Sequence, residues 1–327
     1  MKKLLGSIKH NSIVLVAIVG IVVSLLIRTN PYYLQMVMMC IVFAILASSL
    51  NIAVGLTGLS NLSHATFFGI GAFVAAILST RFHVPFYINM VAGGLVAMSF
   101  GFLLGAPTLR LKGVFLALVT FAFGGAMRVI EMNWMSLTNG PMGIRNIDGA
   151  KIGSWVFSNM AYIYCALAIL ILTLYITDRI VKSKVGRAFF AIKYDETVAK
   201  SMGINITKYK IGAYVLSACL AGMAGAMYAH YVSYVSPDTV TMADSVTVLC
   251  MVVLGGSGTL VGPVIGAVIL TLVPEIFRFA QLYRIVFVGV VMIVVLIARE
   301  NNWWGTISNK LARKPKSVAE QEKWGGT

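Results

Sequence analysis

The stretch that decides the fold lies between residues 32 and 73. Residues 32–54 read YYLQMVMMCIVFAILASSLNIAV, which carries no charge and is long enough to cross a bilayer, since a spanning helix needs about 20 apolar residues. Residues 55–73 then read GLTGLSNLSHATFFGIGAF, in which glycine and polar residues interrupt the helical pattern. This sequence predicts a membrane protein with helices that are broken inside the bilayer.

The composition of the whole chain supports the same class. Of its 327 residues, 59% are hydrophobic and only 11% are charged, whereas a soluble domain carries about 25% charged residues. The mean hydropathy is +0.88. These values exclude a soluble protein. The alternating stretches of about ten residues that mark a membrane β-barrel are absent, so we predict an all-α, polytopic transmembrane helical bundle.

Apolar stretches of membrane length predict about 8 to 10 spans. The stretch at 245–258 is short for a regular crossing and is either a span or a re-entrant segment. The predicted spans are 11–27, 32–54, 64–80, 84–104, 113–130, 159–177, 210–231, 245–258, 260–279 and 283–299.

The distribution of basic residues predicts the orientation of the chain. Lys and Arg number 26 against 11 Asp and Glu, a formal net charge of +15. With the N-terminus inside, the cytoplasmic segments hold 19 of the 26 basic residues and the outside loops hold the other seven, as the positive-inside rule describes. We therefore expect both termini to be cytoplasmic, and the bilayer accounts for the basic charge without a nucleic-acid partner.

This orientation divides the chain into successive parts. They are the cytoplasmic N-terminus 1–10, a first transmembrane half 11–130, an extracytoplasmic loop 131–158, a transmembrane helix 159–177, a cytoplasmic loop 178–210, a second transmembrane half 211–299 and a cytoplasmic tail 300–327.

The inside loop 178–210 has the pattern of a short surface helix. Asp195 is a suitable N-cap, and Gly203 can end the helix in a left-handed conformation. Val198 and Met202 share one face, which suits a coupling helix seated in a groove of a soluble partner. The alternative is a charged loop that only orients the protein. The candidate coupling residues are Gly186, Arg187, Ala188, Ala191, Asp195, Glu196, Ala199 and Gly203.

Two segments, 55–73 and 253–263, carry glycine and polar residues at membrane depth. Broken helices in the two halves of a transporter indicate a substrate path, because irregular backbone at depth is tolerated only where it is buried or lines a cavity. The alternative is a turn beside a packed helix, and a lone histidine such as His64 is also typical of a hydrogen-bonded packing residue. The candidate path residues are Asn51, Ser60, Asn61, Ser63, His64, Thr66, Thr120, Ser245, Ser257 and Thr259.

Small residues recur four apart in the later spans. This spacing lets helix backbones approach closely in lipid, where the hydrophobic effect does not drive association. We assign tight helix packing to Ser217, Ala221, Gly222, Gly225, Gly262 and Gly266.

The sequence lacks the residues that several kinds of chemistry require. The sequence has no GxxxxGK[ST] phosphate loop, so we expect no nucleotide hydrolysis by this chain. No cluster of catalytic or metal-ligating residues converges, which predicts a protein that is not an enzyme and holds no metal. The acidic residues Glu131, Asp244 and Glu275 fall near predicted span ends, and their scarcity within the spans argues against ion coupling.

A series of motifs extends from about Gly55 to Glu275. They read LRLKGVFLA at 109–117, TNGPMG at 138–143, GRA at 186–188, SACLAGMAG at 217–225 and GGSGTLVGP at 255–263. In this order the motifs resemble the membrane permeases of branched-chain amino-acid ABC transporters, and most of all the M type of their two permease subunits.

The resemblance implies a permease subunit that imports leucine, isoleucine, valine or related amino acids across the plasma (inner) membrane of a bacterium. It implies four partners besides the lipid bilayer: a second, homologous permease subunit in a heterodimer, two cytoplasmic ATPase subunits, and an extracytoplasmic substrate-binding protein. ATP and Mg would bind in the ATPases, so no cofactor is expected in this chain. Residues 186–203 match the segment that contacts the ATPase in this family.

The segment 58–65 departs from the family pattern. It reads GLSNLSHA where the family usually reads GQLSLGHA, so Leu59, Asn61 and Ser63 replace glutamine, serine and glycine. The identity of the solute therefore stays open. A permease of the same family for urea, amides or other small polar solutes is one alternative, and a secondary carrier or channel that works without ATP is another.

Overall fold

The computed structural model describes residues 2–27, 30–109, 111, 113–152, 155–239, 241–276 and 289. The predicted tail 300–327 lies outside these residues, as does the predicted span 283–299 except for Gly289. Arg110 and Lys112, which are part of one motif, also lie outside them.

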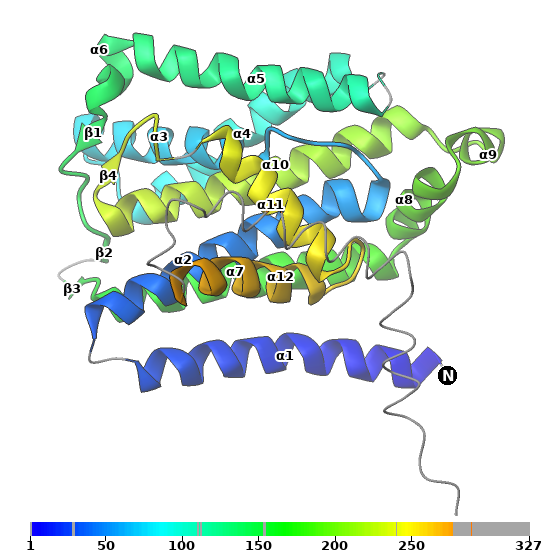
Figure 1. The fold of residues 1–327 in the computed structure, drawn as a ribbon, viewed down its shortest axis with the longest axis horizontal. Helices are drawn as coiled ribbons and strands as arrows, with labels where there is room; N and C mark the ends of the chain where they lie inside the picture. Colours follow the sequence, from blue (N-terminus) through cyan, green and yellow to red (C-terminus); the bar gives the residue numbers. More distant parts are fainter. Residues whose placement is uncertain are drawn as a thin grey trace, which may run out of the picture. The chain divides into compact units, whose positions relative to one another are not determined.

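Helices make up nearly all of the described structure (Figure 1). A π-helix, Asn51–Gly55, directly continues α2, and a short 3-10 helix, Gly140–Met142, follows α6. The α-helices are α1 (Lys2–Leu26), α2 (Pro31–Leu50), α3 (His64–Phe82), α4 (Phe86–Thr108), α5 (Val114–Asn133), α6 (Met135–Thr138), α7 (Asn159–Lys182), α8 (Lys184–Tyr194), α9 (Glu196–Ser201), α10 (Ile206–Val232), α11 (Met242–Gly255) and α12 (Gly262–Ile276).

Six helical segments in the described ranges are long and apolar enough to cross a membrane. They are α2 with its π-helical extension, α3, α4, α5, α7 and α10. Three shorter apolar segments, Ile13–Leu25, Met242–Gly255 and Gly262–Val273, accompany them. The predicted all-α, polytopic bundle is confirmed, and the stretch at 245–258 falls on the short helix α11 up to Gly255 and on the non-helical residues that follow it.

Polar side chains mark several helix starts, where backbone N–H groups have no partner within the helix. Asn30 accepts a hydrogen bond from the N–H of Tyr32, and Pro31 occupies the first helical position, where its missing N–H costs nothing. Asn205 accepts from the N–H of Lys208, so α10 begins before the predicted start at residue 210. The caps that accept backbone N–H groups in this way are Asn30, Ser158, Ser183, Asp195 and Asn205.

The centre of the bundle consists of α10 packed against α3 and α4. A Cβ atom on Gly222 would lie 2.6 Å from the carbonyl oxygen of Gly93 in α4, and one on Gly225 would lie 1.9 Å from that of Phe68 in α3. Ser217 and Ala221 are fully buried on the same helix. These small residues therefore set the spacing between the three helices.

Glycines also bring α11 and α12 together. A Cβ atom on Gly266 would lie 2.0 Å from the carbonyl oxygen of Met251, and one on Gly262 would lie 2.1 Å from that of Gly255. All six residues assigned to helix packing thus lie at buried positions or close helix contacts.

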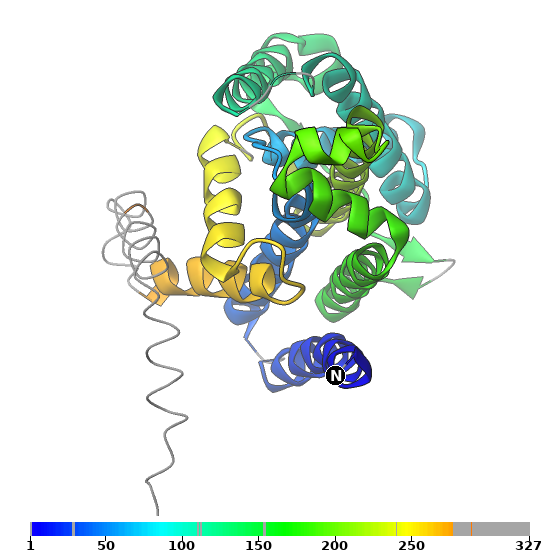
Figure 2. The ribbon, with the colours of Figure 1, turned by 90° about the vertical axis from the view of Figure 1, so that its right-hand side faces the viewer.

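The two ends of the bundle differ (Figure 1). At one end, here called the strand end, β1 (Ile144–Arg145) pairs antiparallel with β4 (Tyr234–Val235), and β2 (Lys151–Ile152) pairs with β3 (Trp155–Val156). At the other, here called the α8 end, α8 and α9 lie across the ends of longer helices (Figure 2). The sequence did not predict the strands, because two-residue pairs are too short to leave an alternating pattern.

Candidate functional site

Regular helix ends at the end of α2, a few residues before the first predicted interruption. Residues 51–55 form a π-helix, a local widening that is frequent at functional sites, and regular helix resumes only at His64. The non-helical residues 58–63 are here called the first break, and residues 256–261, between α11 and α12, the second break. Both glycine-rich interruptions predicted from the sequence are therefore present.

Asn51 joins the π-helix that precedes the first break to the second break. Its side-chain Nδ2 donates to the carbonyl oxygen of Thr259 at 2.8 Å, and its Oδ1 accepts from the backbone N–H of Gly258, also at 2.8 Å. Asn51 is buried, so these two bonds satisfy an amide that would otherwise be costly to bury. Through this one residue, two segments far apart in the sequence come into direct contact.

Glycine is required where the breaks meet. A Cβ atom on Gly55 would lie 1.8 Å from Oδ1 of Asn51 and 2.7 Å from the backbone nitrogen of Gly258. Both distances are far below van der Waals contact, so any side chain at position 55 would force the π-helix and the second break apart.

Lys193, close to the end of α8, contacts the same junction. Its Nζ donates to the carbonyl oxygen of Gly55 at 2.6 Å. The same atom lies 3.5 Å from where a Cβ of Gly258 would be, and the side-chain Cγ lies 3.4 Å from the corresponding position at Gly58. One side chain thus connects α8 to both breaks. The sequence alone marks Lys193 only as one basic residue in a basic loop.

Asn61 and Ser63 belong to a buried polar network with Tyr214 of α10. The Ser63 hydroxyl lies 3.0 Å from both Oδ1 of Asn61 and the hydroxyl of Tyr214. All three residues are buried. Tyr214 was not predicted, because it stands among apolar residues of a span and nothing in its spacing separates it from core.

Three further path candidates lie at or next to the start of α3. Thr120 accepts a hydrogen bond from the N–H of Leu62 at 3.1 Å, and Ser245 accepts from the N–H of Ala65 at 3.1 Å. His64 is fully buried, with Nε2 at 2.8 Å from the hydroxyl of Ser49. The hydroxyls of Thr120 and Ser245 satisfy backbone N–H groups at the N-terminus of α3. Their contact with a solute stays a prediction.

The remaining path candidates lie nearer the surface. Thr259 is exposed, and its hydroxyl donates to the carbonyl oxygen of Gly256 at 2.7 Å. Ser60 and Ser257 are half-buried. Thr66 lines a small cavity whose other lining residues lie outside the two breaks.

The predicted coupling segment consists of two helices, α8 and α9, where the sequence pattern predicts one. Ser183 caps α8 by accepting from the N–H groups of Val185 and Gly186. Asp195 caps α9, as expected, by accepting from the N–H of Thr197 at 2.7 Å and of Val198 at 3.1 Å. Gly203 follows α9 with a φ of +78°, the left-handed conformation expected for a helix stop.

The inner face of this pair is firmly attached to the bundle. A Cβ atom on Gly186 would lie 2.3 Å from the carbonyl oxygen of Ile180 in α7. Ala188 and Ala199 are buried, Ala191 is half-buried and Arg187 is exposed. Glu196 forms an ion pair with Lys210 of α10 at 2.6 Å, and the Lys210 side chain is only 5% exposed.

The outer face exposes three large apolar side chains. Tyr194 is 88% exposed, Val198 54% and Met202 72%. They are here called the outer face of α8–α9. Exposed apolar groups of this size on short helices that are anchored from behind form a surface suited to a protein partner.

The arrangement of long apolar helices around two hydrogen-bonded helix breaks defines a multi-pass membrane protein. The chain belongs to the family described as "Branched-chain amino acid transport system / permease component", which matches residues 32–296. The resemblance seen in the sequence motifs is therefore confirmed.

Curated relatives agree with this assignment. The chain is 33% identical over 318 residues to the high-affinity branched-chain amino acid transport system permease protein LivM of Salmonella typhimurium, which covers 90% of this chain and 75% of the relative. The LivM protein of Escherichia coli is 32% identical over the same shares. The permease protein LivH of Salmonella typhimurium is 25% identical over 70% of this chain and 79% of the relative. No solved structure matches the chain.

Proposed function

We propose that this chain is the permease subunit of an importer that moves branched-chain amino acids and is driven by ATP hydrolysis in partner subunits. Family membership supports the transport of this solute class. The observation that carries the energy coupling is the position of Lys193: it sits at the end of α8, next to the outer face of α8–α9, and its Nζ reaches the junction of both breaks.

The mechanism follows from these contacts. An ATPase that binds the outer face of α8–α9 would move these helices when it binds and hydrolyses ATP. Because Lys193 connects α8 to Gly55, and Asn51 connects Gly55's helix to the second break, the movement would reach both breaks together. The two breaks would then switch between conformations open to opposite sides of the membrane.

The proposed assembly contains a second permease subunit, two ATPase subunits that bind ATP and Mg, and an external substrate-binding protein. The similarity of this chain to both LivM and LivH, two permease proteins of one kind of transport system, supports a heterodimer of homologous permeases. The assembly would lie in a bacterial plasma membrane. The α8 end would face the cytoplasm, as would both termini.

The test uses the complete complex in proteoliposomes, with L-leucine and the substrate-binding protein on the outside. The double variant Val198→Asp/Met202→Asp places charges on the outer face and is expected to lower both ATPase co-purification and ATP-driven uptake by at least tenfold. Thr197→Asp adds charge at a neighbouring exposed position and is expected to keep both. ATPase binding and uptake that survive the double variant would contradict the coupling role.

A second arm of the same experiment tests the energy source. Proteoliposomes that contain this chain without ATPase subunits are expected to take up no L-leucine. Uptake by the chain alone would indicate a carrier or channel and would overturn the proposal.

A further inference from the structure

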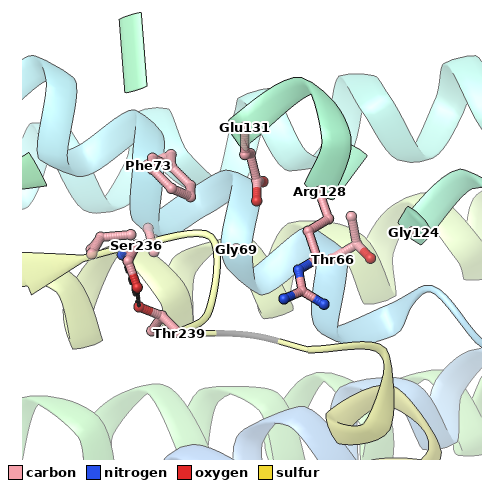
Figure 3. A pocket seen from close by; sticks show the side chains of 10 residues that line it. Thr66, Gly69, Phe73, Gly124, Arg128, Glu131, Ser236 and Thr239 are labelled. Carbon is pink, nitrogen blue, oxygen red and sulfur yellow. Dashed lines mark hydrogen bonds between the residues drawn. The ribbon is translucent and has the colours of Figure 1, made fainter. Parts of the chain in front are cut away.

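A small cavity lies between α3, α5 and the segment that follows β4 (Figure 3). Its polar lining consists of Thr66 from α3, Arg128 and Glu131 from α5, and Ser236 and Thr239 from the segment after β4. The cavity volume is about 20 Å³, which is room for about one water molecule. At this volume the cavity has no room for a whole amino acid, so binding would require it to widen.

Two opposite charges enter this cavity from the same helix. Arg128 and Glu131 stand three residues apart on α5, a spacing that puts them on one face, and Figure 3 shows both side chains directed into the space above Ser236 and Thr239. Charged groups within an apolar helix are costly, and where they occur in membrane proteins they commonly serve function.

Neither charge is fully satisfied by the protein. Arg128 pairs with Asp238 at 2.6 Å through Nη2, while its Nε is buried without a hydrogen-bond partner among the described residues. The Glu131 carboxylate forms no hydrogen bond or ion pair within the part of the chain that the structure describes. A buried donor and a half-buried carboxylate left open in this way favour a ligand that supplies both an acceptor and a cation.

An α-amino acid supplies that pair of groups. We propose that the cavity is a subsite for the α-amino and α-carboxylate groups of the transported amino acid; this inference rests on the function proposed above. Glu131 receives the ammonium group. Arg128, with the hydroxyls of Thr66 and Thr239, receives the carboxylate, since guanidinium groups match carboxylates in geometry and charge.

Asp238 explains how the site stays stable when empty. Its side chain is 68% exposed and its carboxylate lies on Arg128, where the carboxylate of the solute would bind. An arriving amino acid would replace one carboxylate by another, so the guanidinium group is never left without a counter-charge. Exposure of Asp238 to water makes this exchange inexpensive.

The proposal also predicts selectivity. Urea and simple amides carry no charge, so they would supply no cation to Glu131 and no carboxylate to replace Asp238 on Arg128 as the cavity closes around them. Because unpaired charges in a site of low polarity are strongly unfavourable, the cavity selects zwitterionic amino acids over neutral amides.

The first experiment measures ATP-driven L-leucine uptake by the complete complex in proteoliposomes. Glu131→Gln keeps the shape of the side chain and removes its charge, and it is expected to lower uptake at least tenfold, whereas Glu131→Asp retains part of the rate. Asp148→Asn makes the same chemical change in an acidic residue that pairs with His83 at the strand end and is 53% exposed; it is expected to keep the wild-type rate.

The second experiment separates recognition from a structural role. It measures binding of L-leucine, L-leucinamide and 4-methylpentanoate to the purified complex without the substrate-binding protein. The wild-type complex should bind L-leucine at least tenfold more tightly than either analogue. Glu131→Gln should abolish the preference for L-leucine over 4-methylpentanoate, which lacks the ammonium group. Arg128→Gln should abolish the preference for L-leucine over L-leucinamide, which lacks the carboxylate.

The outcomes separate this inference from the function on which it rests. A wild-type complex that takes up no L-leucine contradicts both. Suppose that the wild-type complex takes up L-leucine and that Glu131→Gln and Arg128→Gln keep both its uptake rate and its preferences among the analogues. That result overturns the subsite but not the proposed function. If both variants lose affinity for L-leucine, L-leucinamide and 4-methylpentanoate by the same factor, the subsite is also overturned, because this result shows a general structural defect.

Discussion

At the scale of single residues, polar side chains join segments that are distant in the sequence. Asn51 bonds to Gly258 and Thr259, and Lys193 bonds to Gly55. The sequence marked Asn51 as a polar residue at membrane depth, but its partner depends on how α2 packs against α12, and helical periodicity carries no such information. Arg128 falls near the end of the predicted span 113–130 and lies in α5, but the sequence did not indicate that it lines a cavity.

The contact of Lys193 with Gly55 yields a prediction about coupling. Lys193→Met keeps an unbranched apolar side chain, one atom shorter, that cannot donate to the carbonyl oxygen of Gly55. A hydrogen bond from a charged donor contributes about 1.5 to 3 kcal/mol, so we expect ATP-driven uptake to fall about tenfold or more. ATPase activity of the complex, measured alongside uptake, should remain, because the outer face of α8–α9 is unchanged.

Lys208→Met provides the matched control. Lys208 is exposed at the start of α10 and only its backbone N–H is engaged in capping, so removal of its charge should leave uptake unchanged. Equal rates in Lys193→Met and Lys208→Met would show that the bond to Gly55 does not take part in coupling.

At the scale of elements, six of the predicted spans correspond to described helices long and apolar enough to cross a membrane, and both glycine-rich interruptions are present, because these features depend on local composition. The predicted helix boundaries were less accurate where a helix contains charged residues. The last turn of α7 holds Arg179 and Lys182, which suit the negative end of the helix dipole but end an apolar stretch. Helix α8 was missed for the same reason, although Val185, Ala188 and Ile192 have helical spacing and would have indicated it.

Because α10 contacts α4 closely at one point, the same Gly→Ala substitution should change stability differently at two positions of α10. Gly222→Ala would put a Cβ atom 2.4 Å from that of Ala97 and 2.6 Å from the carbonyl oxygen of Gly93. Forced overpacking of this kind costs about 1 to 3 kcal/mol, so the free energy of unfolding should fall by about that amount. A Cβ atom on Gly212 would have no other atom within 4 Å. Gly212→Ala should therefore leave the free energy of unfolding unchanged or raise it slightly.

Thermal unfolding of the purified protein in detergent, followed by tryptophan fluorescence, measures both variants. The comparison cancels the intrinsic difference between glycine and alanine in a helix, since both substitutions lie in α10. Equal midpoints for the two variants would mean that α4 can move away from α10 without loss of packing.

At the scale of the whole molecule, composition and charge are sufficient to predict the membrane class, because both follow from the bilayer as solvent. The bias of 19 basic residues against seven also predicts which end of the bundle faces the cytoplasm. The cavity between α3, α5 and the segment after β4 could not be predicted, because its lining residues come from parts of the chain that only the tertiary structure brings together.

The predicted orientation can be measured by cysteine labelling in cells. In cells that express the chain without ATPase subunits, Tyr194→Cys at the α8 end should react with a membrane-impermeant maleimide only after the membrane is permeabilised, whereas Met142→Cys, 68% exposed near the strand end, should react in intact cells. The native cysteines are at least partly buried, and the unmodified chain gives their background. Labelling of both variants from outside, or of Tyr194→Cys alone, would contradict the orientation.

The difference between the two ends of the bundle has a consequence for how such a chain can change over generations. At the strand end, Ile144 and Arg145 are joined to Val235 and Tyr234 by backbone pairing, which exchange of one side chain for another leaves largely intact. At the α8 end, the connection passes through the side chains of Lys193 and Asn51. A single substitution can therefore remove the connection between α8 and the helix breaks, whereas the backbone pairing at the strand end persists through substitutions and is altered mainly by insertion or deletion of residues.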